Sequence, residues 1–215
     1  MRLEAERKKI IATCLEMIEK NLTNGTSGNV SIYSREENLV AITPTGVAYK
    51  TMKPEDVSIV DLEGKLIEGK KPTSELEMHL LNYRNRKDIS AIIHAHTIHA
   101  TSVACLRKEL PAVDYMVAVS GAKSVPCAKY ATYGTQELAI NAYESMKGIK
   151  ATLLANHGIN TAADTIENAF HILEQIEYVA HLYILSSQLG TPVILEDSEM
   201  ENMLERFKSY GQAGK

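Results

Sequence analysis

The chain has 215 residues, of which 45% are hydrophobic, and a formal net charge of −4. This length and composition allow a sizeable core, and we expect a single domain over residues 1–215. No basic run provides an electrostatic footprint for nucleic acid, and no apolar run approaches the roughly 20 residues that span a bilayer. We therefore predict neither a nucleic-acid partner nor a membrane partner.

The cellular compartment is indicated by the N-terminus and the cysteines. Residues 1–9 carry charges of both signs and contain no apolar segment typical of a secretory signal. Cys14, Cys105 and Cys127 are odd in number, lie in apolar sequence and form no C-x-x-C pair. We expect them to be reduced core residues of a cytoplasmic protein.

The predicted elements alternate between strands and helices along the chain. Short apolar runs predict strands at 30–33, 39–42, 57–61, 66–67, 91–94 and 151–155. Apolar residues at helical spacing predict helices at about 3–21, 74–84, 99–106, 135–146, 164–189 and from 198 to before 210. Ser74 with Glu77 reads as a capping box, and Thr135 and Asp164 as helix caps. Because the first strands are hairpin neighbours, we expect an α/β domain with a mixed, mostly antiparallel sheet.

Three histidines stand where two predicted strands end. His94 and His96 follow the apolar run 91–93, and His157 follows the run 151–155. Residues i and i+2 of a strand point to the same face, so the first two imidazoles can converge, and the second strand can bring the third beside them. An H-x-H pair alone is weak evidence for a metal, because histidines at strand ends often form local hydrogen bonds. Three neutral nitrogens around one point are the ligand set of a catalytic zinc with an open fourth position.

Three segments are suited to binding an anion. They are the glycine-containing loops 25–29 and 43–46, and the segment 72–74 before a predicted helix. Loop amides and the first amides of a helix favour a phosphate, although each segment taken alone is more typical of an ordinary turn or cap. Glu75 follows the third segment, either as a first-turn glutamate that complements the helix dipole or as an acid/base beside a metal.

Taken in order, five motifs resemble those of the class II sugar-phosphate aldolases. They are GTSGNVS at 25–31, ITPTG at 42–46, KPTSE at 71–75, HAH at 94–96 and NHG at 156–158. The likeness runs from the first helix to residue 211 and so covers nearly the whole chain. It implies a three-layer α/β/α sandwich that assembles as a four-fold symmetric homotetramer, with active sites at the subunit interfaces.

The resemblance also implies roles for individual residues. His94, His96 and His157 would bind one zinc ion per subunit, with Glu75 as a displaceable fourth ligand and the acid/base. The residues that would hold the substrate phosphate are Thr26, Asn29, Thr45, Gly46, Thr73 and Ser74. Thr73 departs from the usual Ser-Ser pair but keeps a hydroxyl.

Three tyrosines match positions near the family's active site. Tyr115 would reach into a neighbouring subunit's site and exchange a proton with the aldehyde oxygen. Tyr133, where related enzymes carry Phe, would line the aldehyde pocket, and Tyr210 would close over the site. Without the resemblance, each reads as an interface or edge packing residue. His79 and His99 receive no chemical role from the sequence.

The implied reaction is the zinc-dependent, reversible aldol cleavage of L-fuculose 1-phosphate to dihydroxyacetone phosphate and L-lactaldehyde. Alternatives on the same scaffold are an L-ribulose-5-phosphate 4-epimerase, a methylthio-pentulose-phosphate dehydratase, and an aldolase for 5-deoxy or methylthio pentulose phosphates. The epimerases typically carry Asp at the position of Glu75, which favours the aldolase. A non-enzymatic, adducin-like head would generally lack the metal histidines.

Overall fold

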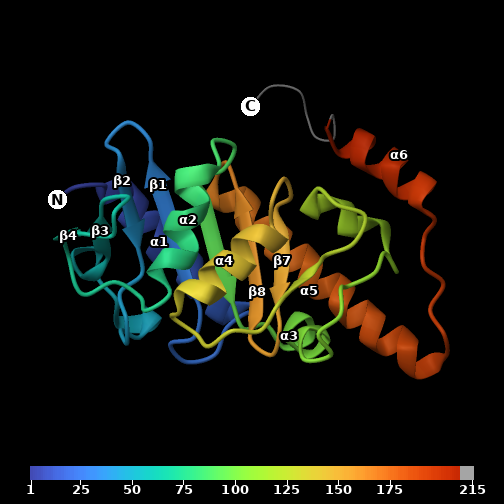
Figure 1. The fold of residues 1–215 in the computed structure, drawn as a ribbon. Coiled ribbons are helices and arrows are strands. Elements are labelled where there is room, and N and C mark those ends of the chain that lie inside the picture. Colours follow the sequence, from blue (N-terminus) through green and yellow to red (C-terminus); the bar gives the residue numbers. More distant parts are fainter. Residues whose placement is uncertain (209–215) are drawn as a thin grey trace.

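One eight-stranded sheet organises the computed structural model, which describes residues 1–208 (Figure 1). The strands lie in the order β4-β3-β2-β1-β5-β8-β7-β6, and neighbours are antiparallel except for the parallel pair β6–β7. Their bounds are β1 Asn29–Ser34, β2 Leu39–Ile42, β3 Ser58–Val60, β4 Leu66–Glu68, β5 Ala91–Ala95, β6 Cys127–Ala128, β7 Ala151–Leu154 and β8 Gly158–Ala163. The expected mixed, mostly antiparallel sheet is confirmed.

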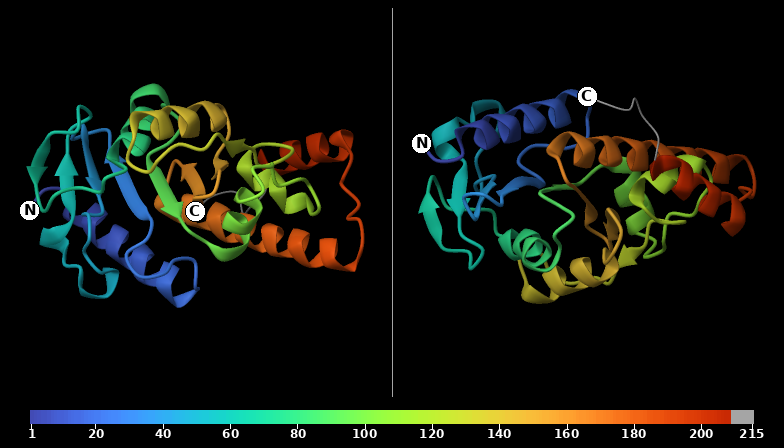
Figure 2. Two further views of the ribbon diagram at one scale, coloured as in Figure 1. Left: turned by 60° about the horizontal axis from the view of Figure 1, so that its bottom comes forward. Right: turned by 90° about the horizontal axis from the view of Figure 1, so that it is seen from above.

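Helices cover both faces of this sheet and complete three layers. Their bounds are α1 Glu4–Glu19, α2 Leu76–Asn85, α3 Ile98–Ala104, α4 Gln136–Ser145, α5 Ile166–Leu189 and α6 Asp197–Lys208, with short 3-10 turns η1 Tyr49–Thr51, η2 Pro54–Asp56 and η3 Tyr115–Ser120. Viewed from above, α1 and α5 lie on one side of the sheet and α2 and α4 on the other (Figure 2). α3 packs against α5, whereas α6 packs on η3. The α/β/α sandwich expected from the resemblance is confirmed.

The position of β5 explains why its sequence is a continuous apolar run. Ile92 packs into the core on the α2/α4 side, whereas Ile93 packs into the larger core on the α1/α5 side. A strand buried on both faces shows no polar alternation. The C-terminal end of this central strand therefore carries His94 into the interior of the molecule, where it is fully buried.

Some predicted boundaries and caps differ from the structure. α2 starts at Leu76, and its N-cap is Glu75, whose side chain makes no capping hydrogen bond. The capping box of Ser74 with Glu77 is therefore wrong, because the turn before α2 is closed by the Thr73 hydroxyl, which accepts from the Glu75 amide at 3.3 Å. Glu77 instead pairs with Arg84.

The sequence also predicted helix caps at Thr135 and Asp164. The first is confirmed, and the second lies one residue later in the structure. Thr135 caps α4, since its hydroxyl accepts from the Leu138 amide at 3.2 Å. α5 is capped by Thr165, whose hydroxyl accepts from the Asn168 backbone N–H. Asp164 precedes this cap and accepts from the Asn168 side chain at 2.8 Å. β6 and β8 were not predicted as strands.

Two further expectations concern the burial of the cysteines and the absence of a membrane-spanning segment. Cys14 is buried and Cys127 partly buried, but Cys105 is exposed, so the expectation that all three lie in the core is wrong for Cys105. All three are free thiols. Within residues 1–208, none of the helices combines the length and the apolar character needed to cross a bilayer.

Candidate active site

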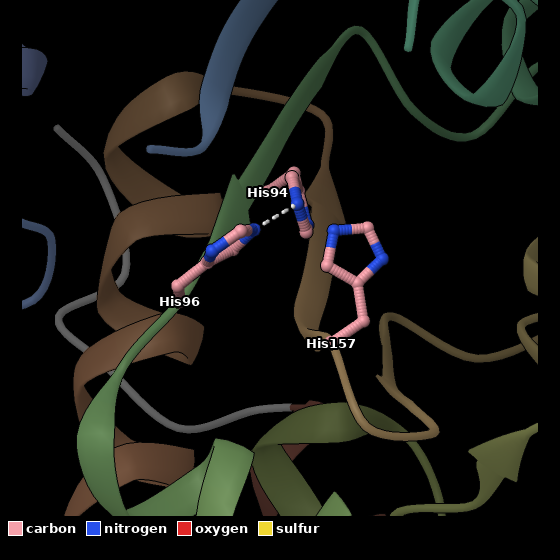
Figure 3. A group of neighbouring side chains, drawn as sticks. All are labelled: His94, His96 and His157. Carbon is pink, nitrogen blue, oxygen red and sulfur yellow. Dashed lines mark hydrogen bonds between the residues drawn. The ribbon is translucent and has the colours of Figure 1, made fainter. Parts of the chain in front are cut away.

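Three imidazoles converge beside the end of β5. His94 is in β5, His96 follows it directly, and His157 lies in the tight turn between β7 and β8. Their candidate ligand nitrogens all lie within 4.8 Å of one another, and the Nε2 atoms of His94 and His96 are 2.9 Å apart. The three side chains point toward a common centre (Figure 3).

The protonation of these rings suits a metal. The Nδ1 of His94 lies 3.1 Å from the Ile159 carbonyl oxygen and donates to it, which leaves the Nε2 lone pair facing the cluster. Burial lowers the pKa of His94 to about 3 and that of His157 to about 4, and burial also lowers the pKa of His96. Neutral rings with converging lone pairs repel one another, and a divalent cation at their centre removes that repulsion.

Glu75 completes the cluster from the start of α2. Its Oε2 lies 3.4 Å from His94 Nε2, and its Oε1 lies 3.4 Å from His157 Nε2. Oε2 also accepts a hydrogen bond from Asn29 Nδ2 at 2.9 Å. Within the described chain, the buried Oε1 has no hydrogen-bond partner. A buried carboxylate oxygen needs a partner, and a cation held by the histidines would supply one. The residues present therefore fit a divalent metal.

Two glycines allow other segments to approach β5 closely at this point. A Cβ on Gly28, whose φ is +82°, would lie 2.5 Å from the His94 carbonyl oxygen. A Cβ on Gly158 would lie 2.4 Å from the Ala95 carbonyl oxygen. Because real Cβ atoms essentially never come this close, the histidine cluster depends on glycine at both positions.

His96 and His157 line a cleft of about 440 Å³, whereas His94 is fully buried and does not line it. Of the predicted site residues, the cleft is lined by Glu75, His96, His157, Thr26, Asn29, Thr45, Gly46, Thr73, Ser74 and Tyr133. The loops of this wall are joined, because the Thr45 amide donates to the Lys71 carbonyl at 3.0 Å and the Thr73 amide to the Thr43 carbonyl at 3.2 Å. The fold thus gathers hydroxyl, amide and backbone N–H donors in the same cleft as His96 and His157.

Of the other two predicted tyrosines, only Tyr115 is among the described residues. Tyr115, in η3, is 49% exposed and does not line the cleft, and its ring centroid lies 6.5 Å from that of Phe207. Tyr210 lies outside the described residues.

Several residues near the site were missed by the sequence reasoning. Tyr130 and Asn156 line the cleft, and Arg107 connects them, since its Nε donates to Asn156 Oδ1 at 2.7 Å and its guanidinium lies 5.5 Å from the Tyr130 ring centroid. His79 is fully buried and contacts Asn29 through a short hydrogen bond. One signal for His79 was available, because it follows Glu75 by four residues and so faces the same side of the helix.

A family model described as "Class II Aldolase and Adducin N-terminal domain" matches residues 8–184. The chain belongs to this family. It is a lyase, since its close relatives are named aldolases.

Two relatives of this class II aldolase act, by their names, on different sugar phosphates. A 5-deoxy-D-ribulose 1-phosphate aldolase from Bacillus thuringiensis serovar kurstaki is 48% identical over 99% of this chain and 100% of its own length. An L-fuculose phosphate aldolase from Escherichia coli strain K12 is 40% identical over 95% of this chain and 94% of its own length. A solved L-fuculose 1-phosphate aldolase superposes with a TM-score of 0.93 at 49% identity, covering 95% of this chain and 96% of that one. The family is metal-dependent, and the three histidines could bind the metal.

Proposed function

We propose that this class II aldolase uses zinc to cleave, reversibly, a deoxy-ketose 1-phosphate into dihydroxyacetone phosphate and a short aldehyde. One observation carries the proposal: the carboxylate of Glu75 lies against a neutral three-histidine cluster, in a cleft whose other wall offers many anion donors. We further expect the enzyme to work in the cytoplasm.

His94, His96 and His157 would hold the zinc ion, with Glu75 as a fourth, displaceable ligand. The metal would supply a Lewis acid that offsets the negative charge developing on the substrate when its C3–C4 bond breaks. Glu75 would then move the proton at the carbon that loses the aldehyde, because its Oε1 has no hydrogen-bond partner in the described chain and faces the cluster. Asn29 would hold the other oxygen of Glu75 through its amide N–H.

The phosphate would be bound by the wall opposite the histidines. Its donors are the hydroxyls of the wall's threonines and serine and the backbone N–H groups of the loop that contains Gly46. Asn29 lies beside them, with its side-chain amide donating to Glu75 and Thr73. These groups come from three chain segments that are tied together by backbone hydrogen bonds. A fixed wall of this kind orients the reacting bond and lowers the entropic cost of reaching the transition state.

We propose that the protein works as a homotetramer in which Tyr115 completes the site of a neighbouring subunit. Support comes from the exposure of Tyr115 and its position outside the cleft of its own chain. Large exposed apolar side chains, which indicate an interaction surface, add to it: Ile98, Leu106, Leu185, Leu189 and Val193. Tyr115 would exchange a proton with the aldehyde oxygen, and Tyr133, 69% exposed on the cleft wall, would face the aldehyde end of the substrate. Tyr210 would close the site.

L-fuculose 1-phosphate is the substrate that we propose first, and 5-deoxy-D-ribulose 1-phosphate is the second candidate. The second is favoured by the 48% identical relative that bears its name. Cleavage would give L-lactaldehyde from the first and acetaldehyde from the second, so the two differ only in the aldehyde half.

A coupled assay for dihydroxyacetone phosphate tests the proposal. Zinc-loaded protein is given L-fuculose 1-phosphate, 5-deoxy-D-ribulose 1-phosphate and L-ribulose 5-phosphate in parallel, and kcat/KM is compared. We expect dihydroxyacetone phosphate from one or both ketose 1-phosphates. Epimerised L-ribulose 5-phosphate, with no triose phosphate released from either of the other two, would contradict the aldolase assignment and support the epimerase.

A further inference from the structure

A ladder of polar side chains joins α2 to β1 directly beneath the cleft. Residues four apart on a helix share one face, and residues two apart on a strand share one face. The helix side is formed by Glu75, His79 and Tyr83, and the strand side by Asn29, Ser31 and Tyr33. The contacts alternate between the two elements and form one chain. In order, they are Tyr33–Tyr83, Tyr83–Ser31, Ser31–His79, His79–Asn29 and Asn29–Glu75.

The hydrogen bonds of the ladder can be assigned one direction. Asn29 Nδ2 lies 2.9 Å from Glu75 Oε2 and 3.3 Å from Thr73 Oγ1, so the amide nitrogen faces the carboxylate as donor. Asn29 Oδ1 therefore faces His79 and accepts from its Nε2–H. A neutral imidazole carries one N–H, so His79 Nδ1 must accept, and it does so from the Ser31 hydroxyl at 2.7 Å.

The hydrogen bond between Tyr83 and Ser31 can be assigned a direction in the same way. Because the Ser31 hydroxyl donates its proton to His79, the Tyr83 hydroxyl donates to Ser31 Oγ at 2.6 Å, which is closer than the Ser31 carbonyl oxygen at 3.2 Å. Asn29, Ser31, His79 and Tyr83 are all at most 3% exposed, which leaves little access for water to replace a lost partner. Burial also lowers the pKa of His79 to about 3, which keeps the ring neutral at ordinary pH.

We propose that His79 is a positioning residue for Glu75, acting through Asn29. The Nε2–H of His79 prevents the Asn29 amide from turning over. In the turned orientation, the amide oxygen would face the Glu75 carboxylate and repel it. Held as it is, Asn29 binds one oxygen of Glu75 and leaves the other directed at the histidine cluster. The inference rests on the acid/base role proposed for Glu75.

Two substitutions of His79 separate positioning from packing. Glutamine can keep a donor near the position of Nε2, whereas methionine fills the space without one. We expect His79→Met to lower kcat by about tenfold to 100-fold, as a misplaced catalytic group does. KM should change little and zinc content should remain, and His79→Gln should restore most of kcat.

The matched control is Asn82→Leu. Asn82 is fully buried on the same helix, and its amide donates to the Met78 carbonyl at 3.0 Å rather than to the ladder. We expect this variant to keep wild-type kcat. Equal losses in His79→Met and Asn82→Leu, a loss confined to KM, or no recovery in His79→Gln would overturn the proposal. In an Asn29→Ala background, His79→Met should cause no further loss, and an additive loss would also count against it.

A spectroscopic readout tests the ladder without any turnover. In wild-type protein labelled with ¹⁵N-histidine, the resonances that disappear in His79→Gln should show a neutral ring with the proton on Nε2, unchanged from pH 8 to pH 5. A proton on Nδ1, or an imidazolium in this range, would overturn the proposal even if His79→Met fails to fold, because the assignment needs only a folded His79→Gln. Wild-type protein that releases no dihydroxyacetone phosphate would count against the proposed function, and the ring measurement would still decide the ladder.

Discussion

Glu75 is the residue whose chemistry the account depends on most. Glu75→Gln keeps the shape of the side chain but cannot carry a proton in the same way, and the three histidines remain to bind metal. We expect zinc content close to wild type with kcat lowered by about 10²-fold to 10⁴-fold, the usual contribution of a general acid/base. Metal analysis and steady-state kinetics measure both. Glu77→Gln, a change in the same helix at a residue paired with Arg84, is the control, and near wild-type kcat for Glu75→Gln would exclude the acid/base role.

The lowered pKa of His79 makes the free energy of unfolding depend on pH. Its pKa is about 3 when folded and close to the ordinary value of 6.5 when unfolded, so between these values the unfolded chain binds the extra proton. The free energy of unfolding should therefore fall as the pH drops below about 6.5, by about 1.4 kcal/mol per pH unit for this one histidine.

Urea unfolding of metal-free protein at pH 7, 6 and 5 measures this effect. His94 and His157 contribute in the same direction, so the difference between wild type and His79→Gln isolates His79. We expect a shallower dependence in the variant at the same protein concentration. Identical slopes would mean that His79 is not buried in its neutral form.

Among single residues, the sequence predicted those that belong to a recognisable motif or spacing along the chain. The spacing of His94 and His96, the third histidine and the glycine loops all identify the cleft that the structure contains. His79 was not predicted, because its role depends on Asn29 and Ser31, which reach it only when β1 packs against α2. The spacing of four residues from Glu75 indicates only that the two side chains share a helix face, and it does not reveal which residues of β1 they contact.

Among the elements, the contact between the loop before β1 and the end of β5 limits what the site tolerates. Gly28→Ala would combine a positive φ with a Cβ 2.5 Å from the His94 carbonyl oxygen. We expect it to destabilise the protein by about 1–3 kcal/mol and to weaken metal binding, because β5 must move. Thermal unfolding and zinc titration with a competing chelator measure the two effects.

Gly25→Ala is the matched control, since Gly25 has a φ of +64° but nothing within 4 Å of its added Cβ. It carries the backbone strain without the clash, so we expect a smaller loss of stability and unchanged zinc affinity. Equal zinc affinity in both variants would show that the close approach at Gly28 does not position His94.

The elements that the sequence did not predict have a physical explanation. β8 follows β7 after a tight turn, and all six of its residues are buried, so no polar alternation marks it as a strand. Asn156, with a φ of +52°, and Gly158 form that turn. An Asn followed closely by Gly between apolar runs is a hairpin signal, and it could have predicted β8. The central strand β5 was predicted because its apolar run ends in the histidines.

For the whole molecule, the account requires subunits to share active sites. A mixture of Glu75→Gln and Tyr115→Phe subunits should recover activity that neither variant has alone. With random mixing, about a quarter of the sites would combine an intact Glu75 with an intact Tyr115 from the neighbour. Light scattering of the mixture should also show a tetramer. A mixture no more active than the two variants would contradict a shared site.

The assembly could not be derived from residue patterns in one chain. Tyr115 has no partner signal in the sequence, and in the structure it lies outside the cleft of its own chain. Its role came only from the resemblance. The mixed, mostly antiparallel sheet and most residues of the cleft, by contrast, were predicted from apolar runs, turns and motifs within the chain, although the order of the strands was not.

The central claim is that the three-histidine cluster holds the metal on which aldol cleavage depends. The most direct measurement is dihydroxyacetone phosphate release from L-fuculose 1-phosphate and 5-deoxy-D-ribulose 1-phosphate, before and after treatment with EDTA and again after zinc is returned. We expect release to be abolished by EDTA and restored by about one equivalent of zinc per subunit, as in a three-histidine site with one open position. Release that survives complete metal removal, or borohydride trapping of a substrate–lysine adduct, would contradict the account.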